Sequence, residues 1–111
     1  MNKLFISLFV TIIFCSQILA QSPAENLSAK IAQKMKDSLS LSNVQKNQLY
    51  AINMRLCGQK ETVRQQYAAT DSLRIKIQKI ENTRDSLYST VLTNQQLILY
   101  KPKKRNLVNN N

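Results

Sequence analysis

A single glycine in 111 residues is the feature that most limits what this chain can fold into. Only two prolines accompany it, whereas average usage is about 7% glycine and about 5% proline. Sandwiches and barrels need many tight turns with positive φ, which glycine adopts without steric cost. All-β architecture is therefore nearly excluded, and we predict an all-α fold in one domain.

The chain is strongly basic, with sixteen Lys and Arg against six Asp and Glu and a net charge of +10. Such a charge ordinarily indicates nucleic acid, acidic proteins or acidic surfaces as partners. Histidine is absent from the sequence, which removes the commonest general base and the commonest zinc ligand. One glycine also precludes a glycine-rich phosphate loop. We therefore expect no enzymatic activity, no catalytic residue, no metal and no cofactor.

Residues 1–20 have the order of a secretory signal peptide. Lys3 precedes an apolar run from Leu4 to Phe14, and a more polar stretch ends at Ala20. The run is shorter than the ~20 apolar residues of a comfortable membrane span, although an uncleaved anchor is the alternative. Cleavage after about Ala20 would export the chain without a membrane span, which argues against nucleic acid as its partner.

Helix starts are marked by three S/T-x-x-E/Q capping boxes, which begin at Ser22, Ser42 and Thr93. Apolar residues then recur with helical spacing. Together these signals predict helices over about 23–39, 43–69 and 72–91, and a short last helix that Pro102 ends.

The two long helices, 43–69 and 72–91, are expected to fold back on each other, and one continuous helix over 43–91 is the alternative. Asp71 is a weaker N-cap candidate for the second of them. Its apolar residues follow the three- and four-residue steps of a coiled-coil-like seam, with Arg84 in one apolar place. We expect Arg84 either to pair with an acid on another helix or to extend to solvent.

The domain organisation predicted from these signals is a signal peptide over 1–20, a helical domain over 21–100 and a basic disordered tail over 101–111. The tail is predicted because its sequence, KPKKRNLVNNN, is rich in charge and asparagine.

Two segments, 41–45 and 92–96, match the pattern LTxxQ, the first with Ser42 in place of Thr. Two copies about fifty residues apart in a small, basic, exported helical chain resemble the Spy/CpxP-like LTxxQ family of periplasmic proteins, over roughly residues 34–100. The resemblance implies a bowed antiparallel helical hairpin with short flanking helices, which forms a homodimer. It also implies that the motif residues join the two ends of the hairpin through caps and an apolar contact. These residues are Leu41, Ser42, Gln45, Leu92, Thr93 and Gln96.

For function, the resemblance implies a periplasmic ATP-independent chaperone-like or envelope-stress adaptor protein that binds unfolded or acidic clients on a basic helical surface. One alternative is a regulatory module that docks on the sensor domain of a membrane kinase. Another is a structural helical protein bound to acidic envelope components. The absence of histidine departs from zinc-binding relatives, so a metal role is not expected.

The candidate client surface consists of cations and apolar side chains on the two long helices. Its residues are Arg55, Lys60, Arg64, Arg74, Lys76, Tyr50, Met54 and Ile75. A solvated face that keeps the chain soluble is the simpler interpretation of the cations. Tyr50 and Met54 form a second apolar line on the helix over 43–69 together with Cys57, and this line should meet a second subunit or a client. A dimer core is its simpler interpretation.

Cys57 is the only thiol outside residues 1–20. We expect a small, partly buried side chain there, with a redox switch or an intermolecular disulfide as alternatives. Its neighbour Gly58 is expected to mark a bend or a close approach, because glycine weakens a helix by about 1 kcal/mol relative to alanine.

Overall fold

The computed structural model describes residues 22–109, and these form an all-α fold. Its helices are α2 (Pro23–Leu39), α3 (Asn43–Tyr67), α4 (Ser72–Glu81), α5 (Arg84–Tyr88) and α6 (Asn94–Val108). The all-α prediction is thus confirmed for this part of the chain. The predicted signal peptide lies outside the described residues. Among α2 to α6, no helix is long and apolar enough to cross a bilayer.

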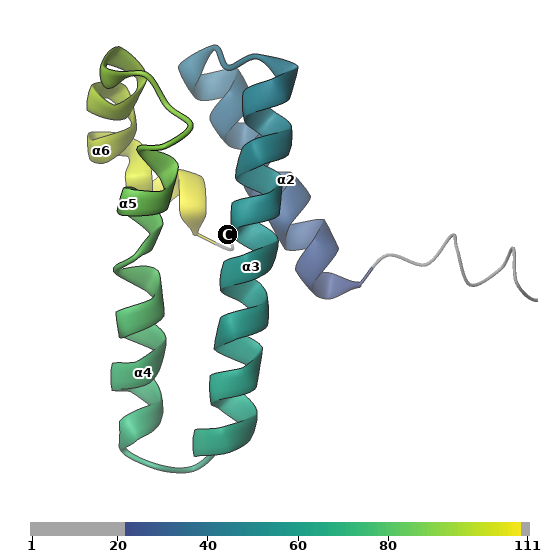
Figure 1. The fold of residues 1–111 in the computed structure, drawn as a ribbon, viewed down its shortest axis with the longest axis vertical. Helices are drawn as coiled ribbons and strands as arrows, with labels where there is room; N and C mark the ends of the chain where they lie inside the picture. Colours follow the sequence, from purple (N-terminus) through teal and green to yellow (C-terminus); the bar gives the residue numbers. More distant parts are fainter. Residues whose placement is uncertain (1–21, 110–111) are drawn as a thin grey trace, which may run out of the picture.

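Helix α3 is the centre of the arrangement (Figure 1). Helix α2 packs across one side of it, while α4 and α5 follow one another back along the other side. Helix α6 then packs against α2. Below the level of α2 and α6, only α3 and α4 continue, and we call this two-helix part, residues 65–76, the arm.

The hydrophobic core lies in the upper part of the molecule, at the level where α2, α3, α5 and α6 meet. Tyr88 and Tyr100 are its largest fully buried side chains, and their rings meet edge to face with centroids 5.5 Å apart. Helix α4 contributes no buried residue. The core cluster consists of Ile31, Ala32, Met35, Leu39, Leu41, Leu49, Tyr88, Leu92, Tyr100 and Leu107.

The prediction of a disordered tail over 101–111 is wrong for residues 101–108, which belong to α6, while 110–111 lie outside the described residues. Pro102 sits inside the helix rather than ending it. Proline removes one intrahelical hydrogen bond, but burial of Leu107 in the core offsets that loss. In addition, Lys34 Nζ of α2 donates to the carbonyl oxygens of Asn106 (3.1 Å) and Asn109 (3.3 Å), which lie at the end of α6.

The single helix predicted over 72–91 is also wrong, because it is divided into α4 and α5 at residues 82–83 and ends at Tyr88. Three hydroxyl groups donate to the carbonyl oxygen three residues before them. The bonds run from Thr83 to Ile80, from Ser89 to Ser86 and from Thr90 to Leu87, at 2.6–2.7 Å. Such side-chain bonds compete with regular helical pairing and favour turns.

Helix α3 ends at Tyr67, two residues before its predicted end, and Ala69 then adopts a positive φ of 60°. Asp71 stands at the N-cap position of α4 without a side-chain capping bond, contrary to prediction. Within α3, the expectation of a close approach at Gly58 is wrong, because a Cβ added there would meet nothing within 4 Å.

Candidate functional site

The two LTxxQ-like segments each begin a helix with a complete capping box. In α3, Ser42 Oγ accepts from the backbone N–H of Gln45 (3.1 Å), and Gln45 Oε1 accepts from that of Ser42 (3.0 Å). Thr93 and Gln96 repeat this pattern in α6, at 3.2 and 3.0 Å. The boxes predicted at these two places are confirmed. At Ser22 only the hydroxyl half forms, with the N–H of Glu25 (3.2 Å).

The same glutamines bring the two segments together, although they lie 51 positions apart in the sequence. Gln45 Nε2 donates to Gln96 Oε1 (2.8 Å) and to the carbonyl oxygen of Val91 (3.1 Å). Each amide therefore completes its own helix start through its oxygen, while the nitrogen of Gln45 joins α3 to the start of α6. The two glutamines thus take part both in the local capping of their helices and in the long-range contact between them.

The leucine of each segment is anchored in the core: Leu41 and Leu92 are only 5% and 7% exposed. Leu41 also ends the preceding helix. Ser40 takes the left-handed conformation (φ 55°), and the N–H groups of Ser40 and Leu41 both reach the carbonyl oxygen of Lys36. This is the Schellman-type helix end, in which the residue after the left-handed position packs its side chain inward.

The residues of the candidate client surface do not form one continuous patch. Arg55, Arg74 and Ile75 are exposed, whereas Tyr50 packs against the core. Lys76 lies over the ring of Tyr67, at 5.3 Å from the centroid. Lys60 is half-buried, and its ammonium group contacts the carboxylate of Glu81 at 2.5 Å. Its charge is therefore largely neutralised by this ion pair.

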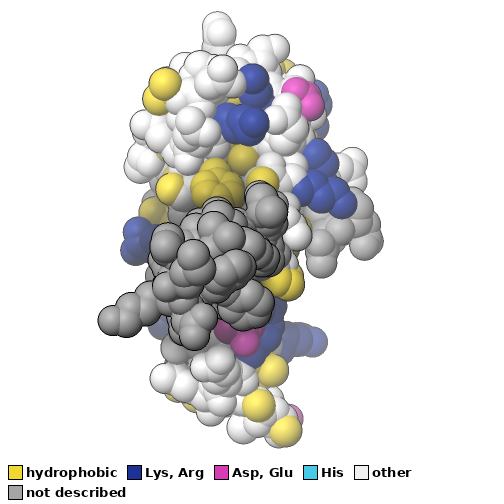
Figure 2. All heavy atoms as spheres, turned by 90° about the vertical axis from the view of Figure 1, so that its right-hand side faces the viewer, with side chains coloured by type: hydrophobic (Ala, Val, Ile, Leu, Met, Phe, Trp, Pro, Cys, Tyr) yellow, Lys and Arg dark blue, Asp and Glu magenta, His cyan; other side chains and the backbone are white. Residues whose placement is uncertain are grey.

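Three of these residues, Met54, Lys60 and Arg64, meet along an open cleft of about 1040 Å³ between the first turns of α2 and the middle of α3. We call it the α2–α3 cleft. Its apolar lining comes from both helices and includes Leu27, Ile31, Met54 and Cys57. Cations line it at Lys30, Lys60 and Arg64, and Glu61, which lies 3.5 Å from Arg64 on the exposed surface, lines it as well. On the side of the molecule that α2 occupies, Lys and Arg side chains form separate patches with apolar side chains between them (Figure 2).

Cys57 faces this cleft rather than a second apolar stripe on the surface. It is half-buried, and its Sγ lies 3.8 Å from Ser28 Oγ of α2. Helix α2 thereby covers part of the line of Tyr50, Met54 and Cys57 that sequence reasoning assigned to a second subunit or a client.

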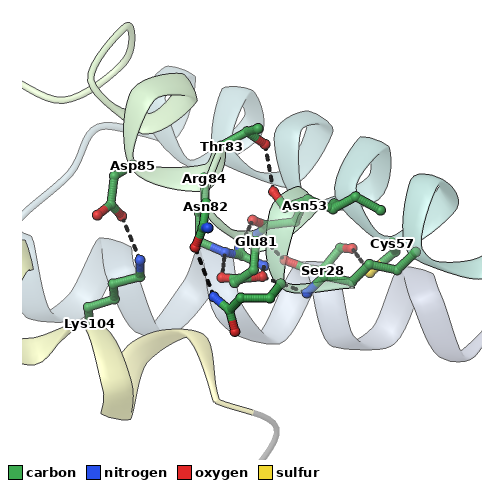
Figure 3. A network of polar contacts seen from close by, with 12 residues as sticks. Ser28, Asn53, Cys57, Glu81, Asn82, Thr83, Arg84, Asp85 and Lys104 are labelled. Atoms are coloured by element: carbon green, nitrogen blue, oxygen red, sulfur yellow. Dashed lines mark hydrogen bonds and ion pairs between the residues drawn. The ribbon is translucent and has the colours of Figure 1, made fainter. Parts of the chain in front are cut away.

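A buried polar network beside the cleft is the main feature that the sequence did not predict as a unit (Figure 3). Arg84 is only 4% exposed and donates through Nε and Nη2 to both oxygens of Glu81, at 2.5 and 3.1 Å. Its Nη1 donates to Asn53 Oδ1 (3.1 Å) and to the Tyr88 hydroxyl (2.7 Å). Arg84 thus pairs with an acid three residues before it, at the break between α4 and α5.

Asn53 extends this network across α3. Its Oδ1 also accepts from the Tyr88 hydroxyl, and its Nδ2 donates to the carbonyl oxygen of Ser28 (3.1 Å) in α2. Four helices are therefore joined through one asparagine and one arginine. No buried side-chain nitrogen or oxygen among the described residues lacks a partner.

The ionisation of the network follows from its burial and its charges. Burial alone would raise the pKa of the Glu81 carboxyl, but hydrogen bonds and charge from Arg84 and Lys60 outweigh it, so that pKa is lowered. Burial raises the pKa of Tyr88 to about 12, despite the nearby Arg84 charge. Burial and then the hydrogen bond to Asp85 raise the pKa of Tyr100. These groups keep one charge state around neutral pH, as suits a structural network.

Sequence reasoning found part of this network. The polar residue in an apolar place of the seam indicated that Arg84 would need a partner. Asn53, which sequence reasoning missed, carries the same signal: it lies four residues after Leu49 and three before Leu56, in the apolar stripe of its helix. Ser28 is a small residue between Leu27 and Ala29 and gives no sign of a partner. Within residues 22–109, no three His, Cys, Asp or Glu side chains come together as a metal site would require.

Comparison of the chain with protein-family models, curated proteins and solved structures yields no match.

Proposed function

We propose that this chain is a periplasmic, ATP-independent chaperone-like or envelope-stress adaptor protein of the LTxxQ type, which binds unfolded or acidic segments of client proteins. The observation that carries the proposal is the α2–α3 cleft, whose apolar floor is bordered by Lys30 and Arg64, both exposed. An unfolding chain offers what such a surface can hold, namely apolar side chains and unpaired acidic groups.

Binding would proceed in two steps. The net charge of +10 attracts acidic segments over a distance that salt limits. Shallow apolar contact with Leu27, Ile31 and Met54 then retains them. Methionine suits this role because its flexible thioether adapts to different side chains.

We also propose that two copies associate, with the bowed hairpin as the unit. The support is the arm, where Tyr67 and Leu73 are only half-buried because none of the other described helices covers α3 and α4 there. Sedimentation of the chain at micromolar concentration tests this part. A dimer is expected, and a folded monomer would contradict it.

The test of the binding function is suppression of aggregation of an unrelated denatured protein, without nucleotide. Suppression is expected at about 50 mM salt and should weaken at about 500 mM, because the Debye length falls severalfold across that range. No suppression at a severalfold molar excess of this protein would contradict the function.

Two charge-reversal variants then locate the site. Lys30→Glu with Arg64→Glu removes the cations of the cleft, and Arg55→Glu with Arg74→Glu makes the same change in net charge elsewhere on the surface. The first pair should abolish most of the suppression and the second should leave most of it. Equal effects would mean that overall charge, and not the cleft, attracts the client.

A further inference from the structure

The outward face of α6 carries exposed apolar and basic side chains that do not belong to the proposed client-binding cleft. At about 100° per residue, Ile98 and Pro102 fall on the face opposite the buried Tyr100 and Leu107, and Leu99 falls at the edge of that face, about 100° from Tyr100. Ile98 is 70% and Leu99 48% exposed, and both are among the few large apolar side chains exposed in the described part of the chain. Together with Pro102 they give the exposed side of α6 a short apolar ridge, which Ile98 and Leu99 bound on its two sides.

Cations border the ridge on both sides. The helical spacing puts Lys101 and Arg105 along one side, at the rim of an open hollow between α6 and α4, and Lys103 along the other, and all three are exposed. Helix α6 contains no Asp or Glu. The nearby Asp85 contacts Lys104 (3.1 Å), which turns toward the interior. In the ion pairs of residues 22–109, none of the three exposed cations takes part.

The ridge is held in place from its inner side. Tyr100 is fully buried and donates to Asp85 (2.9 Å), and Leu107 is buried in the core. Lys34 of α2 binds the carbonyl oxygens at the end of α6. Segment 101–108, basic in sequence, is therefore a fixed helix whose cations have set positions relative to Ile98 and Leu99.

We propose that this face of α6 binds the surface of a lipid bilayer that contains anionic phospholipid. Ile98 and Leu99 enter the boundary between headgroups and acyl chains, while Lys101, Lys103 and Arg105 contact lipid phosphates. A helix with an apolar centre and basic borders lies in the plane of a membrane interface in this way. Clustered cations beside it favour anionic lipid.

The chemistry of the ridge favours a bilayer over other acidic partners. The boundary between headgroups and acyl chains takes up exposed aliphatic side chains such as Ile98 and Leu99, while lipid phosphates take up the cations beside them. Nucleic acid would neutralise the cations but offers no place for two exposed aliphatic side chains. The inference goes beyond client binding and does not depend on it, because it uses a different helix and different cations.

The test is sedimentation of the full chain with vesicles of phosphatidylcholine containing phosphatidylglycerol, and with vesicles of phosphatidylcholine alone. Lys101→Glu, Lys103→Glu and Arg105→Glu together form the first variant. Arg55→Glu, Arg64→Glu and Arg74→Glu together form its control, because they make the same change in net charge on α3 and α4. Residues 1–20 are common to all forms, so their contribution cancels in the comparison. Far-UV circular dichroism confirms that each variant is helical.

We expect the α6 variant to bind the anionic vesicles at least about tenfold more weakly and the control less than about threefold, since each cation near an anionic surface contributes separately. Ile98→Ser with Leu99→Ser should weaken binding severalfold at high salt as well, where charge is screened. Equal losses in the two triple variants would overturn the proposal in favour of non-specific attraction. So would equal binding to both kinds of vesicle, or binding that survives the loss of Ile98 and Leu99.

Discussion

Arg84 shows how one residue can determine the course of several helices. It occupies an apolar place in the helical seam and points inward, where Glu81, Asn53 and Tyr88 satisfy its donors. A buried charge of this kind is stable only when its partners are complete. We therefore interpret the network as a determinant of how α3, α4 and α5 pack, and not as a large net contribution to the free energy of unfolding.

Removal of Arg84 should be strongly destabilising. Arg84→Ala leaves Glu81 with Lys60 and Asn53 with the Tyr88 hydroxyl as their remaining donors, and the loss of one partner from a buried ion pair typically costs about 3–5 kcal/mol. Chemical denaturation measures the loss in the free energy of unfolding. Arg74→Ala, at an exposed position of α4, is the matched control and should change stability by less than about 0.5 kcal/mol. Equal losses in the two variants would show that the network contributes no more to the free energy of unfolding than an exposed arginine does.

Acid should weaken the same network. The pKa of Glu81 in the folded protein lies below its ordinary value of 4.5, so the unfolded chain binds the proton more readily. The contribution of Glu81 is thus fully present above about pH 4.5 and is lost as pH falls through the lower, folded-state pKa. Thermal melting of the native chain and of Glu81→Gln from pH 7 downward measures this.

The two melting temperatures should differ most near neutral pH and converge in acid. All other carboxyl groups are the same in both proteins, so their titration does not affect the difference. A difference that stays constant with pH would contradict the assignment to Glu81.

At the scale of the elements, helix starts were predictable and helix interruptions were not. A capping box is a local pattern, and Ser42 and Thr93 form their bonds within four residues. The division of α4 from α5 lies at Thr83, whose hydroxyl donates to the carbonyl oxygen of Ile80, and a threonine at such a place does not by itself predict that a helix ends. The persistence of α6 beyond Pro102 depends on where Leu107 packs.

Gly58 offers a test at this scale. It lies on an exposed face of α3, and an added Cβ would meet no atom within 4 Å. Gly58→Ala should therefore stabilise the protein by about 1 kcal/mol, through the reduced backbone freedom of the unfolded chain. Ala51→Gly, at another exposed position of α3, should destabilise it by a similar amount. A loss of stability in Gly58→Ala would mean that the glycine is required for a bend.

At the scale of the whole molecule, the C-terminal helix completes the core instead of trailing from it. Leu107→Ala should lower the free energy of unfolding by about 2–4 kcal/mol, because it leaves a cavity among buried side chains. Asn106→Ala changes an exposed side chain of the same turn and should have little effect. Denaturation of both variants distinguishes this from a disordered tail, in which neither substitution would matter.

Of the candidate surface, the sequence identified the residue types but not their grouping. Met54 and Arg64 line one cleft because α2 lies against α3, and that packing depends on contacts between distant parts of the chain, such as Asn53 with Ser28. Arg55 and Ile75 are of the same residue types, basic and apolar, but they do not line this cleft. Periodicity assigns a residue to a face of its own helix and does not tell which other helix covers that face.

The arm has one further consequence, which concerns local opening. Helix α4 contributes no buried residue, and the Lys60–Glu81 contact stands where the arm joins the core. Separation of the two helices below that point would expose little apolar surface and would leave the tyrosine cluster intact. Backbone amides of residues 65–76 should accordingly exchange with solvent through small openings, while those around Leu49 and Tyr88 exchange only through global unfolding. A chain this short thus contains a stable end and an end that opens separately.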